Sequence, residues 1–118
     1  MGGDVRIVVD ADACPVKREI ADTARLFGVP ALLVASYDHE LAGEPGVEVR
    51  QVERGRDAVD VYISNLVRPG DIVVTQDFGL AALALAKGAT ALSNRGQLYR
   101  NETIDFLMAS RHDQAKAR

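Results

Sequence analysis

The feature that most constrains the fold is the alternation of short apolar runs with segments of helical periodicity. Four runs, residues 5–9, 31–35, 71–75 and 89–92, are almost continuously apolar. Strands of this kind are typical of a parallel sheet that is buried on both faces. Residues 47–52 instead alternate between apolar and polar, which predicts a half-exposed strand at the edge of that sheet.

Helical segments separate these strands. Residues 15–27 begin with Pro15, which suits a first helical position, and are followed by Gly28. Residues 57–67 and 80–87 repeat the pattern and end before Pro69 and Gly88. Asn101 is a suitable cap for a last helix through Ile104, Leu107 and Met108, after a turn and small hairpin at residues 96–99. The alternation predicts an α/β protein, a three-layer α/β/α sandwich with a mostly parallel sheet.

Length and composition bound the classes of function. The 118 residues predict a single domain, and the net charge of −3 argues against nucleic-acid binding by bulk positive charge. Aromatic residues make up only 5%, with no Trp, which disfavours a base-stacking platform. A single cysteine, Cys14, allows no internal disulfide, and neither a signal peptide nor a membrane-spanning run is apparent. We therefore expect a cytoplasmic protein that does not associate with membranes.

Aspartates gather where the predicted strands end. Asp10 ends the first strand, Asp12 follows it, and Asp77 follows the strand at 71–75, whereas Asp57 and Asp60 share one face in the first turn of a helix. In a parallel sheet the carboxyl ends of the strands meet at one edge, where ligands of such folds bind. We expect these side chains to converge there.

Clustered carboxylates repel one another, and a divalent cation removes that cost. Oxygen ligands suit Mg²⁺ or Mn²⁺, which activate water for the hydrolysis of phosphate esters. The predicted ligands are the five aspartates, Asp10, Asp12, Asp57, Asp60 and Asp77, and the predicted catalytic residues are Asp10, Asp60 and Asp77. The competing interpretation is structural, because Asp57 and Asp77 each precede a helix and are suitable N-caps.

Basic and amide side chains near the same edge are candidates for contacts to substrate phosphate. These are Lys17, Arg56, Asn94 and Arg95. Cys14 lacks the arginine spacing of a phosphatase nucleophile, so packing at a tight turn is the favoured interpretation. For His39, in a polar loop, a solvated position is favoured over an acid–base role.

Several motifs resemble those of one family. Residues 9–17 (VDADACPVK) carry the strongest signal, and further matches are residues 34–39, 54–60, 70–81 and 95–96. The sequence resembles the YaiI/YqxD family of bacterial proteins, which is grouped with PIN-like nuclease domains, from Val5 to about Arg118. Many relatives read Asn-Pro-Arg-Gly at residues 93–96 and continue past residue 118 into a basic tail.

The resemblance implies a PIN-like fold and an acidic pocket like that of metal-dependent ribonucleases. Asp10 looks like the first-strand acid of such a pocket, Asp60 with Asp57 like the helix acid, and Asp77 like the later strand-end acid. RNA is the substrate that this implies, with Mg²⁺ or Mn²⁺ as cofactor.

Two alternatives stay open at this stage. A haloacid-dehalogenase-like phosphatase would use Asp10 as nucleophile and Asp12 as acid, and would cleave small phosphomonoesters. The other is a binding module for nucleic acid or protein that has the pocket but no turnover.

Overall fold

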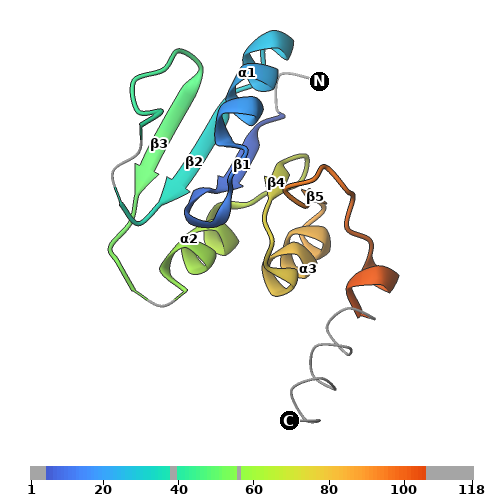
Figure 1. Ribbon diagram of the computed structural model, residues 1–118. Helices are drawn as coiled ribbons and strands as arrows, with labels where there is room; N and C mark the ends of the chain where they lie inside the picture. Colours follow the sequence, from blue (N-terminus) through green and yellow to red (C-terminus); the bar gives the residue numbers. More distant parts are fainter. Residues whose placement is uncertain (1–4, 38–39, 56, 106–118) are drawn as a thin grey trace.

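A computed structural model describes residues 5–37, 40–55 and 57–105. Five strands alternate with three α-helices and one 3₁₀ turn (Figure 1). Their bounds are β1 Ile7–Asp10, η2 Ala11–Ala13, α1 Lys17–Phe27, β2 Ala31–Ala35, β3 Val47–Gln51, α2 Ala58–Leu66, β4 Ile72–Val74, α3 Phe78–Ala86 and β5 Thr90–Leu92.

All five strands are parallel, in the order β3-β2-β1-β4-β5. β1 lies at the centre, where Ile7 is in register with Ala31 of β2 and with Ile72 of β4. The chain builds the sheet outward from β1 in one direction as far as β3 and then crosses over to β4. The strand order therefore reverses between β1 and β4, which is where folds of this type open a crevice at the carboxyl ends of the strands.

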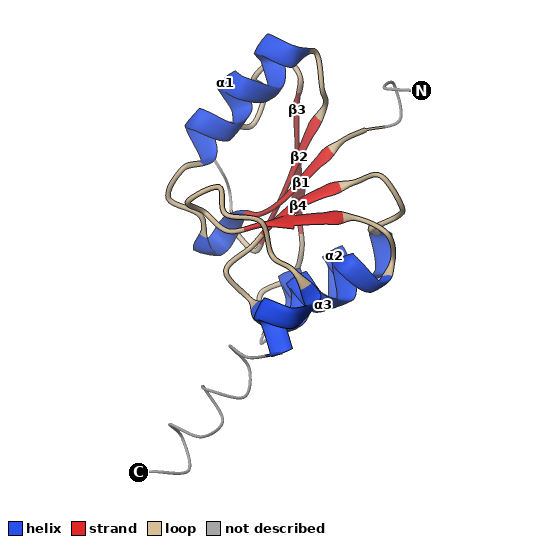
Figure 2. Ribbon diagram, turned by 90° about the vertical axis from the view of Figure 1, so that its right-hand side faces the viewer, coloured by secondary structure: helices blue, strands red, loops and turns tan. Residues whose placement is uncertain are grey.

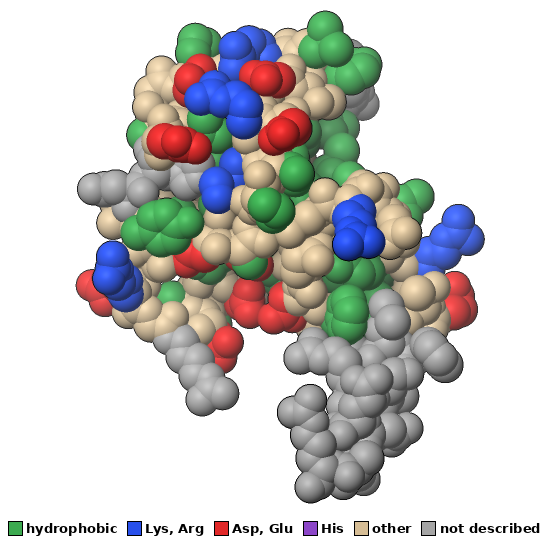
Figure 3. Space-filling view, viewed as in Figure 1, with side chains coloured by type: hydrophobic (Ala, Val, Ile, Leu, Met, Phe, Trp, Pro, Cys, Tyr) green, Lys and Arg blue, Asp and Glu red, His purple; other side chains and the backbone are tan. Residues whose placement is uncertain are grey.

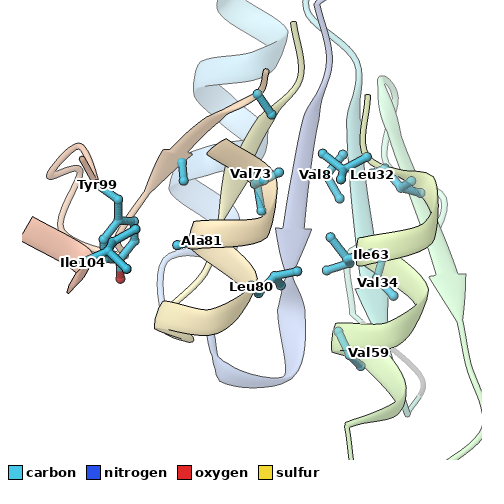
Figure 4. Packing of buried hydrophobic residues seen from close by; sticks show 14 residues of the cluster. Val8, Leu32, Val34, Val59, Ile63, Val73, Leu80, Ala81, Tyr99 and Ile104 are labelled. Atoms are coloured by element: carbon cyan, nitrogen blue, oxygen red, sulfur yellow. The ribbon is translucent and has the colours of Figure 1, made fainter. Parts of the chain in front are cut away.

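The helices cover the two faces of this sheet, so the molecule is a three-layer α/β fold. Figure 2 shows α1 on one face and both α2 and α3 on the other. On the face of α2 and α3, Val8 and Val34 from the strands meet Ile63 and Leu80 from the helices (Figure 4). On the face of α1, the strand residue Val9 packs with small helix residues such as Ala21 and Ala24.

The predicted elements are confirmed with small shifts of their ends. The sheet is wholly rather than mostly parallel, and α3 begins at Phe78, two residues before the predicted start. Of the predicted hairpin, the structure has an antiparallel bridge between Leu98 and Leu92. Residues 101–105 are helical, whereas Leu107 and Met108 lie outside the described residues.

Among the residues that the structure describes, none of the helices combines the length and the apolar character that a bilayer span requires.

Candidate active site

Asp10 is the last residue of β1, at the point where the strand order reverses. Its side chain is on the same side of the sheet as Val8, because side chains alternate along a strand. Only 8% of the residue is exposed. Burial raises the pKa of the Asp10 carboxyl, the hydrogen bond from Thr75 opposes this, and repulsion from Asp12 and Asp77 adds to it.

Thr75 connects Asp10 to Asp77. Its Oγ1 donates to Asp10 Oδ2 at 3.1 Å and accepts the backbone N–H of Asp77 at 3.0 Å. Its carbonyl oxygen accepts the Tyr99 hydroxyl at 3.0 Å. The sequence did not predict Thr75 as a member of the acidic site, although a hydroxyl residue two positions before a strand-end acid was the available signal.

Asp77 lies directly before α3 and is both an N-cap and a member of the acidic cluster. Its Oδ1 accepts the backbone N–H of Leu80 at 2.9 Å, which confirms the capping interpretation. The same carboxyl lies near Asp60 and Asp10, and its charge raises the pKa of both. Capping fixes one oxygen of Asp77 and thereby holds the carboxyl at the edge of the sheet.

Asp60 comes from the first turn of α2 and completes the cluster. Burial, the nearby carboxyl of Asp77, and repulsion from Asp10 and Asp57 raise the pKa of Asp60 to about 7. Asp10, Asp60 and Asp77 thus interact with one another, and we call these three residues the acidic cluster. In Figure 3, acidic side chains gather in the middle of the molecule, near the base of the sheet.

The other two predicted ligands are arranged differently. Asp12, in η2, accepts hydrogen bonds from Ser36, from its backbone N–H at 3.0 Å and its hydroxyl at 2.5 Å. It is therefore joined to the end of β2. Asp57 is exposed, has a left-handed backbone with φ 63°, and makes no side-chain cap on α2. Asp57 reaches the acidic cluster only through its repulsion of Asp60.

Two of the predicted phosphate contacts, Lys17 and Asn94, both donate hydrogen bonds to backbone carbonyls in or next to η2. Lys17 Nζ donates to the carbonyl oxygens of Ala11 at 3.2 Å and Cys14 at 2.7 Å, so it stabilises the end of η2. Arg95 is exposed and lines a groove beside α1 that contains none of the acidic cluster. Arg56 and His39 lie outside the described residues.

Asn94 has a structural role that the sequence did not reveal. Its Nδ2 donates to the carbonyl of Ala13 at 3.0 Å, and its N–H donates to Gln76 Oε1 at 2.7 Å. It thus joins the loop after β5 to η2 and to the end of β4. Its buried Oδ1 has no hydrogen-bond partner among the described residues. Cys14 is buried, and burial raises the pKa of its thiol, as expected for a packing residue.

The donors of the acidic cluster are carboxylate oxygens alone. Within residues 5–37, 40–55 and 57–105, no three His, Cys, Asp or Glu side chains are arranged so that they could hold a metal ion together. In the same part of the chain, Asp10, Asp60 and Asp77 form no salt bridge with a Lys or Arg. Mg²⁺ typically uses only one or two protein carboxylates and completes its shell with water and phosphate, so the carboxylates of Asp60 and Asp77 are of the ligand type that it takes.

Comparison with known proteins places the chain in a family. The fold and the acidic cluster define an α/β protein with a candidate site built from aspartates. The model of the family described as "Uncharacterized BCR, YaiI/YqxD family" matches residues 8–118. The chain belongs to this family. It is 46% identical over 112 residues to a UPF0178 protein of Halalkalibacterium halodurans, covering 95% of this chain and 71% of that one. A UPF0178 protein of Listeria monocytogenes is 44% identical over 113 residues, covering 96% and 77%. No solved structure was found to match the chain.

Proposed function

We propose that this protein is a Mg²⁺- or Mn²⁺-dependent phosphodiesterase that cleaves single-stranded RNA at the acidic cluster. One observation carries the proposal: the carboxyls of Asp60 and Asp77 lie close to each other and to Asp10, and the pKa of Asp60 is raised to about 7. Carboxyls brought together without a compensating cation are costly for a fold, and perturbed pKa values of this kind are concentrated at functional sites.

Each residue of the cluster has a distinct part in this proposal. Asp60 and Asp77 would hold the cation, which would offset the repulsion between their carboxylates. Asp10, fixed by the Thr75 hydroxyl, would orient water at the same edge. When bound, the cation lowers the pKa of water and stabilises charge on the departing oxygen. The N-cap holds Asp77 in place, so little reorganisation is needed on binding.

The contacts of Asp12 favour a nuclease over a phosphatase of the haloacid-dehalogenase type. That phosphatase requires Asp12 to deliver a proton to the leaving group beside Asp10. Ser36 instead engages both Asp12 oxygens, at 3.0 Å on Oδ1 and 2.5 Å on Oδ2. RNA is proposed as substrate from the resemblance to PIN-like domains, since the family itself is described as uncharacterized.

The test is cleavage of labelled single-stranded RNA with Mn²⁺ by the purified chain. Asp10→Asn, Asp60→Asn and Asp77→Asn are each expected to reduce cleavage at least about 100-fold. Asp22→Asn is the matched control, because Asp22 is an exposed aspartate on α1 that pairs with Arg25. Cleavage that survives all three cluster substitutions contradicts the mechanism. Hydrolysis of a small phosphomonoester instead of RNA would favour the phosphatase, and Mn²⁺ binding without any cleavage would favour a binding module.

A further inference from the structure

A groove of about 630 Å³ lies on the opposite side of the sheet from α2 and α3. One wall is α1, with Ile20 and Phe27, and the floor is formed by β1, β4 and β5, with Ile72, Val74 and Leu92. The loop after β5 closes one part of it through Asn94 and Arg95. The groove is therefore mainly apolar, and it is separate from the acidic cluster.

The connections of the strands explain why this groove is open. α1 links β1 to β2 and covers that half of the face, whereas α2 and α3 both lie on the other face (Figure 2). Among the described residues, no helix covers β4 and β5 on the α1 side. Strands of a parallel sheet are normally covered on both faces. Ile72 and Leu92 are accordingly only half-buried.

Large apolar side chains protrude beside the groove. Leu26 is 79% exposed and Phe27 is 72% exposed at the end of α1, and Phe27 lines the groove. Figure 3 shows hydrophobic atoms at the upper right, near α1, and in the recess below them. Exposed apolar side chains that adjoin an apolar recess are typical of an interaction surface.

Opposite charges lie on opposite walls of the groove. Glu19 is on the α1 wall, and Arg95 is on the loop wall. Both are exposed, and within the described part of the chain neither forms a salt bridge. A two-fold axis parallel to the groove would bring the α1 wall of one molecule against the loop wall of another.

We infer that the groove is the interface of a two-fold dimer, and that a second copy of this chain occupies it. In this dimer α1 of each copy covers β4 and β5 of its partner, and Phe27 enters the partner's groove. The same rotation sets Glu19 of each copy opposite Arg95 of the other, twice per dimer. A single two-fold rotation therefore buries the apolar residues and pairs the opposite charges at the same time, as an isologous interface requires. An apolar small molecule could cover the apolar floor of the groove, but it would leave Glu19 and Arg95 without partners.

The experiment is measurement of molar mass by light scattering and sedimentation over a wide range of protein concentration. The 118-residue chain is expected to dimerise. Phe27→Asp is expected to weaken dimerisation about 30-fold or more, as for a central apolar contact of an interface. Leu83→Asp is the matched control, since Leu83 is an exposed leucine on α3, on the other face of the sheet, and it is expected to leave the dimer intact.

Exchanging the charges of Glu19 and Arg95 tests the proposed two-fold rotation. Glu19→Arg and Arg95→Glu are each expected to weaken the dimer about tenfold, and the double variant to restore it. Circular dichroism confirms that each variant is folded, and Phe27→Ser replaces Phe27→Asp if the latter is not. A monomer at every concentration overturns the inference, and would point to another occupant such as residues 106–118. A dimer indifferent to Phe27, or a double variant that fails to recover, overturns it as well.

Discussion

The aspartates at the two ends of β4, Asp71 and Asp77, have opposite electrostatic surroundings. At the amino end, Asp71 is 0% exposed, but Arg6 meets both of its oxygens, at 2.9 and 3.1 Å, and the backbone N–H of Arg68 adds a third contact at 3.0 Å. Beyond the carboxyl end, Asp77 has a backbone N–H as a partner and otherwise meets Asp60 and Asp10.

The difference separates a structural acid from a candidate functional one. A buried carboxylate that stabilises a fold is paired with a cation and hydrogen-bonded, as Asp71 is. The acidic cluster has no cationic partner among the described residues, and burial together with like charges raises the pKa of Asp10 and of Asp60. The predictions below test this contrast in order of decreasing effect.

Replacing Arg6, the positively charged partner of Asp71 at the amino end of β4, should lower the stability of the protein most. Arg6→Met is expected to lower the free energy of unfolding by about 3 kcal/mol, because it leaves the buried Asp71 without its closer ion-pair partner and with only the exposed Arg68, at 3.9 Å. Urea unfolding measures this loss. Arg6→Met combined with Asp71→Leu should recover part of the stability, and a double variant no better than the single one would contradict the interpretation.

Thr75 should matter more for its hydroxyl than for its shape. Thr75→Val keeps the volume but removes the donor to Asp10 and the acceptor for Asp77 N–H, so we expect a loss of about 1–3 kcal/mol. Thr75→Ser retains the hydroxyl and is the matched control. Equal unfolding free energies for the two variants would show that the hydrogen bonds contribute little.

The two roles of Asp77 can be separated by a pair of variants. Asp77→Ala removes the cap on Leu80 N–H and should cost about 1 kcal/mol. Asp77→Asn keeps an oxygen that can accept this bond and removes only the charge, so thermal unfolding should change little. RNA cleavage should be lost in both, and a fully active Asp77→Asn would remove this carboxylate from the proposed site.

The acidic cluster should give the protein an unusual dependence on pH. Asp60 has a pKa of about 7 when folded and about 4 when unfolded, so the folded state holds the proton more tightly. Without metal, stability should therefore fall as pH rises from about 4 to about 7, and then level off. Asp60→Asn should flatten that part of the curve and raise stability at pH 8 by up to about 1 kcal/mol, since solvent screens a partly exposed group. Melting temperatures across this range measure the effect, and an unchanged slope would show that another group titrates.

Much of the fold could be predicted because local patterns determine it. The apolar run at 31–35 coincides with β2, and the alternation at 47–52 marks β3 as an edge strand. Gly28 ends α1 in a left-handed conformation, φ 66°, which glycine adopts without strain. Strand ends then located Asp10 and Asp77 at one edge of the sheet.

Contacts between distant residues could not be predicted in the same way. Nothing local in the sequence pairs Arg6 with Asp71, or Asp12 with Ser36, because these contacts depend on which strands become neighbours. Asp12 and Asp57 were grouped with the other acids by their places after a strand and in a helical turn. The structure adds contacts that those places could not reveal, because Asp12 accepts hydrogen bonds from Ser36 and Asp57 has a left-handed backbone, while Asp12 repels Asp10 and Asp57 repels Asp60.

The central position of β1 has a consequence for how the chain is made. β1 emerges first and gains its neighbour β2 early, but its other edge pairs with β4, and the Asp10–Thr75 contact joins residues 65 apart. During synthesis one backbone edge of the apolar strand β1 therefore stays unpaired until β4 has been made. Unpaired strand edges of this kind can pair with strands of other molecules. Translation that stalls before β4 would yield a fragment prone to aggregate and unable to assemble its three acids.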